Sequence, residues 1–127
     1  MTPEDFFAGS PLGLATLDRV TAAIDAAGGA TVRVTPSQVA FRRRRGFAYL
    51  WRPGQYLRHP GADVVLSVVL DRRDPSPRWK EVVHPAPAHW MHHLEVRTPA
   101  DIDGEVTGWL REAAALAGPS RGEDEVS

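Results

Sequence analysis

The amino-acid sequence predicts an α+β domain: a largely antiparallel sheet of about five to six strands, flanked by an N-terminal and a C-terminal helix on one face. Three observations support this fold class. Apolar residues recur at helical spacing near both ends of the chain, they alternate with polar residues through the middle, and proline and glycine separate the alternating segments. Helix, strands and then helix is the order expected of an α+β domain.

Two helical segments are expected before residue 30. The run Thr2-Pro3-Glu4-Asp5 combines a capping residue, a proline at the first helical position and an acid at the third, which predicts a short helical turn. Ser10-Pro11 repeats this start, and the helix from residue 11 to about 27 places Leu17, Val20 and Ile24 on one stripe. Two consecutive glycines at 28 and 29 end it.

The middle of the chain is expected to form strands. The segments are 31–35, 38–44, 46–51, 63–71, 81–84 and 90–97, each bounded by turn residues. Val39 and Phe41 are assigned to the core face of the second segment. The segment 63–71 is apolar on both faces apart from Ser67, which places it in the sheet interior.

Two further faces follow from the alternation. Phe47, Tyr49 and Trp51 are expected to share one face of their strand. In the last strand the expected core set is Trp90, His92, Leu94 and Val96.

The C-terminal helix is the clearest element. Thr98-Pro99-Ala100-Asp101 combines a capping box with proline at the first helical position, and apolar residues follow at helical spacing from Ile102 to Ala117. We expect a single domain over 1–118 and a disordered acidic tail over 119–127, because the last residues contain almost nothing apolar to bury.

Composition narrows the class of protein. The chain has 127 residues and no cysteine, so disulfides and zinc-thiolate sites are excluded and a cytoplasmic location is expected. No apolar run approaches the roughly 20 residues that cross a bilayer, and the N-terminus lacks the basic start of a signal peptide. We therefore expect no membrane association.

Positive charge is concentrated in the middle of the chain. No acid occurs between residues 26 and 62, whereas Arg42, Arg43, Arg44 and Arg45 follow one another there. If this run continues the strand, Arg42 and Arg44 project from the face opposite Phe41 and could together hold an anion. A solvated edge that deters aggregation is the alternative.

Histidines are concentrated near the last strand. His84, His89, His92 and His93 fall within ten residues, but their spacing matches no metal-binding signature, so no metal site is expected. His92 and His93 must point to opposite faces, and His92 is expected to be a hydrogen-bonded core residue. His93 and Glu95 share the other face, where an acid–base pair is geometrically feasible.

Three segments carry a resemblance to a known family. They are Val39–Ala48 with its arginine run, Arg78–Val82, and Met91–Glu95 followed by the helix through Trp109 and Leu110. Together they resemble a bacterial family known as domain of unknown function 5655, over roughly residues 6 to 117. The resemblance implies a compact stand-alone module and implies no catalytic residue.

The sequence hypothesis for function is a non-enzymatic binding module for a small anionic or aromatic ligand, or for a protein partner. Its ligand is expected to contact side chains that combine cations and rings outside the core, namely Arg42, Arg44, Tyr49, Trp79, Lys80 and His93. No cofactor and no catalytic residue is assigned. The alternatives are nucleic-acid binding through the arginine strand, which the near-neutral net charge of −1 disfavours, an enzyme using His93 and Glu95, and a homodimer.

Overall fold

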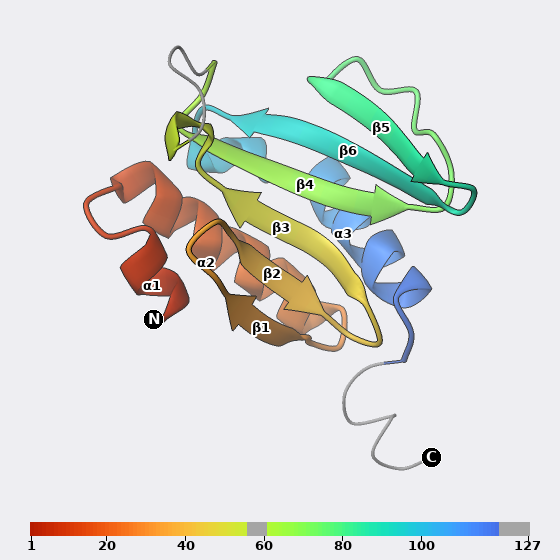
Figure 1. Cartoon of the computed structure of the whole chain (residues 1–127), viewed down its shortest axis with the longest axis horizontal. Helices are drawn as coiled ribbons and strands as arrows, with labels where there is room; N and C mark the ends of the chain where they lie inside the picture. The colour runs from red at the N-terminus through yellow and green to blue at the C-terminus, as the bar shows by residue number, and fades with distance from the viewer. Residues whose placement is uncertain (56–60, 120–127) are drawn as a thin grey trace.

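The computed structural model describes residues 1–55 and 61–119 (Figure 1). The expected acidic tail therefore lies, except for its first residue, outside the described residues. Helices and strands follow in this order: α1 (Pro3–Phe6), α2 (Pro11–Ala26), β1 (Thr31–Val34), β2 (Val39–Arg42), β3 (Gly46–Trp51), the 3-10 turn η1 (Pro53–Gln55), β4 (Val64–Leu70), β5 (Glu81–Ala86), β6 (His89–Val96), the 3-10 turn η2 (Pro99–Asp101) and α3 (Gly104–Leu116).

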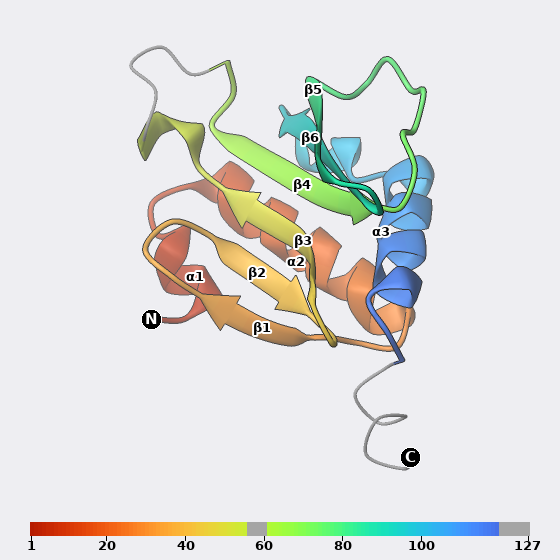
Figure 2. The ribbon, with the colours of Figure 1, turned by 45° about the vertical axis from the view of Figure 1, so that its right-hand side comes forward.

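The strands form one antiparallel sheet with the order β1-β2-β3-β4-β6-β5. Helices α2 and α3 both lie behind the sheet in the view of Figure 1, and the sheet twists strongly so that β5 and β6 are seen edge-on in Figure 2. The fold class predicted from the sequence is thereby confirmed, including the placement of both long helices on one face. The opposite face carries no helix among the described residues.

The core lies between the sheet and the two helices. Strand β4 is buried at every position, as its apolar sequence predicts, and the buried stripe of α2 contains Leu17, Val20 and Ile24. His92, Leu94 and Val96 are buried on β6, and Val39 and Phe41 on β2. Cross-strand pairs such as Phe41 with Ala48 continue this core face from strand to strand.

A β-bulge gives Phe47 a different face from the one expected. Phe41 pairs with Ala48, but Arg42 pairs with Gly46, so Phe47 is an extra residue between two paired positions. Its side chain is buried in the helix-covered core, whereas Tyr49 and Trp51 are only half-buried. The expectation that these three rings share a face is therefore wrong for Phe47.

The arginine run is not one strand. Strand β2 ends at Arg42, and the next three arginines form the connection to β3. In this connection the Arg43 amide donates to the Arg45 carbonyl at 3.0 Å, and the Arg44 amide donates to the Ala117 carbonyl at 3.0 Å. Strand alternation stops where these bonds begin, so the expectation that Arg42 and Arg44 project side by side is wrong.

The Arg43 guanidinium joins the C-terminal ends of α2 and α3. It donates to the carbonyl oxygens of four residues at distances between 2.8 and 3.2 Å, and these residues are Ala27, Gly29, Ala114 and Gly118. The last turns of a helix leave carbonyl groups without intrahelical partners, and they carry partial negative charge. Neither helix has a basic residue in its own last turn, so Arg43 supplies the missing cation to both.

The C-terminal helix begins later than its capping box predicts. Thr98 and Asp101 do form the capping box, but the turn that it starts is the short η2. The backbone then leaves helical geometry at Ile102, and the Asp103 side chain accepts a hydrogen bond from the Val106 amide to begin α3. Two consecutive caps, rather than one, therefore start this segment.

Replacing Arg43 by alanine should destabilise the chain strongly. The variant loses four charge-assisted hydrogen bonds from a half-buried group, and we expect the free energy of unfolding to fall by about 2–4 kcal/mol. Urea denaturation measures this change, with Arg33→Ala on the exposed strand β1 as the matched control, expected within about 0.5 kcal/mol of the parent. Equal stability of the two variants would show that Arg43 does not hold the helices together.

Candidate functional site

The open face of the sheet carries a row of polar side chains across its centre. Cross-strand pairing places Tyr49 opposite Ser67, Ser67 opposite His93, and His93 opposite Glu81. Side chains at directly paired positions lie on the same face, so these four residues form one line from β3 to β5. His93 and Glu95 lie on β6, and Glu81 lies on the neighbouring strand β5.

Ser67 connects two aromatic groups on this face. The Trp51 indole Nε1–H donates to Ser67 Oγ at 2.9 Å, and Ser67 Oγ lies 2.6 Å from His93 Nδ1. The Trp51 and His93 rings meet edge to face, with centroids 6.0 Å apart. These contacts fix both rings, and because Nδ1 is directed at Ser67, the other ring nitrogen of His93 is directed away from it.

A hollow of about 190 Å³ lies beside this arrangement. Val65 and Pro53 contribute apolar surface to it, and the Trp51 ring forms one wall. Its complete lining is Trp51, Pro53, Gly61, Val65, Lys80, Glu81, His93 and Glu95. This residue set is what a small-molecule site usually contains, a mostly apolar surface with a few polar groups that could fix an orientation.

Two carboxylates define the charge of the hollow. Glu95 is only 19% exposed, its carboxylate packs against Gly61, and it pairs with Arg97 at 3.3 Å. Glu81 is exposed and faces His93 from the neighbouring strand. Against these acids the lining supplies a single lysine, Lys80, so the hollow is acidic when His93 is neutral.

Burial governs the protonation of His93. It lowers the pKa of His93 below the ordinary value of 6.5, and the nearby Glu81 charge opposes this effect only in part. The imidazole is therefore neutral at neutral pH. In this state its ring nitrogens can accept one hydrogen bond and donate one.

The sequence-predicted site residues do not all meet. The structure brings Lys80 and His93 together in the hollow, and Tyr49 lies in the same row as His93. Arg42 and Tyr49 lie beside Gly46, where an added methyl group would overlap the Tyr49 hydroxyl and lie 3.2 Å from Arg42 Nη1. Arg44 is elsewhere, with its side chain against Gly118 at the end of α3.

Trp79 belongs to the core, contrary to the expectation that it lies outside it. Its ring is 8% exposed and packs between Trp109 of α3 and the buried His92, at centroid distances of 4.2 and 4.9 Å. The cause is the carboxylate of Asp74, which accepts hydrogen bonds from both indole N–H groups, at 3.0 Å from Trp79 and 3.2 Å from Trp109.

Asp74 organises a buried polar cluster on the helix-covered side. Burial acts to raise the pKa of Asp74, but hydrogen bonds from the Trp79 indole, a backbone amide and the Arg72 guanidinium outweigh it and hold the pKa below its ordinary value. Arg72 also pairs with Glu112 of α3 at 2.8 Å. Asp74, Arg72 and Glu112 pair with one another, although the Arg72 and Glu112 side chains are partly exposed, so the cluster has a structural role.

His92 completes the same cluster and is a hydrogen-bonded core residue, as expected. Its Nε2 accepts from the Asp74 amide at 3.0 Å, and its Nδ1 lies 3.0 Å from the Trp90 carbonyl. Nδ1 must therefore carry the proton, and His92 is neutral. Within residues 1–55 and 61–119, no three side chains of the metal-binding types converge.

The sequence reasoning missed Trp51, Ser67 and Glu81 as site residues. Ser67 was visible as the one polar residue of the apolar segment 63–71, and this interruption was the available signal. For Trp51 the signal was the strand face that it was expected to share with Tyr49. Glu81 gave none, because its position beside His93 depends on which strands are neighbours in the sheet.

The sheet, its two covering helices and the open-face hollow define a small α+β fold in which no helix of the described residues covers the second face. The chain belongs to the family described as a domain of unknown function (DUF5655), which matches residues 4–116. No curated protein and no solved structure matches the chain. None of the helices in the described residues is both long enough and apolar enough to cross a membrane.

The two neighbouring histidines should make stability depend on pH. Burial lowers the pKa of both His92 and His93, so between their folded values and about 6.5 the unfolded chain binds more protons than the folded one. The free energy of unfolding should therefore be constant above about pH 7 and decrease as the pH falls below about 6.5. Urea denaturation at several pH values measures this, and His93→Gln should reduce the slope. A flat profile down to pH 5 would contradict the assignment.

Proposed function

We propose that the protein is a small-molecule binding module whose ligand occupies the open-face hollow. The observation that carries this proposal is the Trp51–Ser67–His93 arrangement, because it holds two rings in fixed positions beside a hollow of about 190 Å³. A planar ligand could lie against the Trp51 ring and Val65. Rings fixed in advance reduce the entropy lost on binding.

The charge of the hollow favours one kind of ligand. Arg97 pairs with Glu95 from outside the lining, but the lining itself holds two carboxylates, Glu81 and Glu95, against one lysine, and His93 is neutral, so a ligand there contacts more negative than positive groups. An aromatic compound that carries an amine or another hydrogen-bond donor fits better. Of the ligand classes expected from the sequence, this supports the aromatic one over the anionic one.

Binding is better supported than catalysis. The short contact between Ser67 and His93 resembles a nucleophile and its base, but Ser67 is 2% exposed and lies below the two rings. Its strand β4 is paired on both sides, so the backbone N–H groups there are engaged in the sheet rather than available to an oxyanion. Glu95 pairs with Arg97, which leaves the His93 and Glu95 enzyme hypothesis without a distinguishing observation.

Nucleic-acid binding also has less support than small-molecule binding. Arg43 is fully engaged with helix ends, and Arg42 and Arg44 do not share a surface. A groove that follows a phosphate backbone requires several adjacent cations.

We place the module in the cytoplasm, because it lacks cysteine.

The charge preference can be tested with two compounds that share one ring. Tryptamine and indole-3-acetate differ in the sign of their charge, and we expect tryptamine to bind more tightly by about fivefold or more. Titration followed by amide NMR shifts measures both affinities and locates the site. Shifts should centre on β6 and the neighbouring ends of β3 and β5.

Matched variants separate the site from general charge effects. Glu81→Gln and Glu95→Gln together should abolish the preference for the amine, whereas Asp71→Asn, an exposed aspartate outside the hollow, should leave it unchanged. Tighter binding of the carboxylate would overturn the proposed ligand class. Absence of shifts around the hollow with a wider set of aromatic amines would overturn the binding role.

A further inference from the structure

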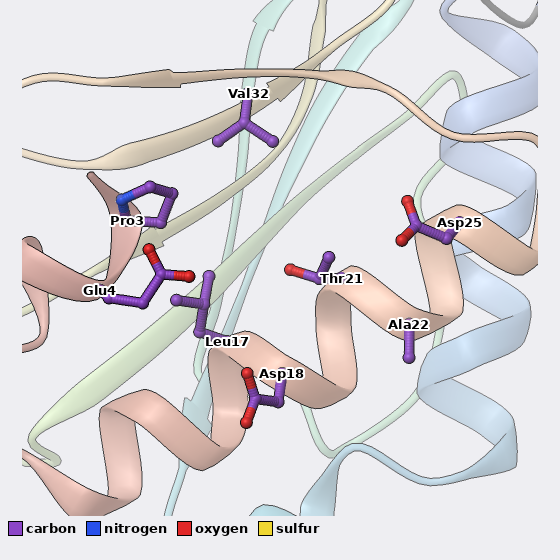
Figure 3. Close-up of a pocket in the computed structure, with 8 residues that line it drawn as sticks. All are labelled: Pro3, Glu4, Leu17, Asp18, Thr21, Ala22, Asp25 and Val32. Carbon is purple, nitrogen blue, oxygen red and sulfur yellow. The ribbon is translucent and has the colours of Figure 1, made fainter.

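A second hollow lies on the other side of the molecule, where the edge strand β1 passes over α2 near α1 (Figure 3). Its volume is about 290 Å³. It is lined by Pro3, Glu4, Leu17, Asp18, Thr21, Ala22, Asp25 and Val32. The proposed ligand site shares none of these residues, so this hollow is a separate surface.

The backbone beside this hollow is open to pairing. Strand β1 is the last strand of the sheet and pairs only with β2 among the described strands. Thr31, Val32 and Arg33 are exposed, and Val32, which is 40% exposed, points toward α2 in Figure 3. An edge strand presents unpaired N–H and C=O groups that can accept a further strand.

Acidic side chains surround the apolar part of the hollow. Glu4 extends from α1, and Asp18 and Asp25 lie two turns apart on α2 (Figure 3). All three are exposed, and none forms an ion pair with the part of the chain that the structure describes. Their charge is therefore available to a partner.

We propose that this groove binds an extended, basic segment of a partner protein, which adds a strand to β1. Alternate side chains of the added strand would enter the hollow next to Val32. Lysine or arginine suits these positions, because the aliphatic part of the side chain covers Leu17 and Ala22 while the charged end reaches Asp18 or Asp25. The β1 edge thus supplies the main-chain hydrogen bonds, and the Asp18 and Asp25 carboxylates favour lysine or arginine in the bound segment.

Charge also distinguishes this partner from a second copy of the chain. Antiparallel pairing of two β1 strands about a twofold axis would place the α2 helices of both copies on the same face, next to each other. Asp18 and Asp25 of one copy would then approach the same acids of the other copy. This repulsion disfavours a homodimer through β1.

The test uses a short capped peptide that alternates lysine with threonine, and the same peptide with glutamate in place of lysine. The lysine peptide should shift the amide NMR signals of β1 and slow their hydrogen exchange, since added-strand pairing protects them. The glutamate peptide should do neither. Affinity for the lysine peptide should decrease as salt increases.

Variants assign the effect to the groove. The double substitution Asp18→Asn and Asp25→Asn should lower the affinity for the lysine peptide by about fivefold. The control substitution Asp71→Asn, at an exposed aspartate elsewhere, should leave this affinity unchanged. Three results would each overturn the proposal. They are equal affinity of the Asp18→Asn/Asp25→Asn protein and the Asp71→Asn protein for the lysine peptide, no binding of that peptide, or a dimer in light scattering together with protection of the β1 amides without peptide. Because the two hollows share no residue, none of these results bears on the ligand site.

Discussion

The arrangement of the two long helices depends on one guanidinium group. Helices α2 and α3 both direct their negative ends toward the connection between β2 and β3, and neither has a basic residue in its last turn. Without Arg43, four carbonyl groups would lose their side-chain donor, and only that of Ala114 would keep a backbone donor, the Ala117 amide at 3.2 Å, among the hydrogen bonds of the described residues. The arginine therefore joins three segments that are far apart in sequence, and it fixes where the helices end on the sheet.

Periodicity in the sequence was sufficient to predict the fold class, the position of every strand and the buried faces of β2 and β4. On β6 it was right for His92, Leu94 and Val96 but wrong for Trp90, which is half-buried and stacks on His84 of β5. Periodicity failed where the strand pairing is interrupted. The bulge at Phe47 and the turn at Arg43–Arg45 both interrupt strands whose side chains continue the same pattern of residue types. Such interruptions arise from tertiary contacts, here burial of a ring and capping of helices, which a local pattern does not contain.

The candidate site was less accessible to sequence reasoning than the fold. Lys80 and His93 were identified because cations outside the core are visible in the sequence, and both line the hollow. Trp79 was misplaced because a buried carboxylate, Asp74, provides the acceptor that its indole N–H needs, and a polar partner of this kind lets a tryptophan enter the core. Cross-strand neighbours such as Ser67 and His93 are adjacent only because β4 pairs with β6, although β5 separates them in sequence.

The two edges of the sheet differ in a way that limits how it can grow. Strand β5 contains Pro85, which has no amide hydrogen to donate, and its pairing with β6 shifts register between Val83 and Ala86. Strand β1 contains neither feature. A continuous fibre needs two compatible edges on each molecule, one to accept a neighbour and one to offer to the next. This sheet has one such edge among the described strands, so copies of the chain that joined through β1 would form a pair and not a continuous fibre.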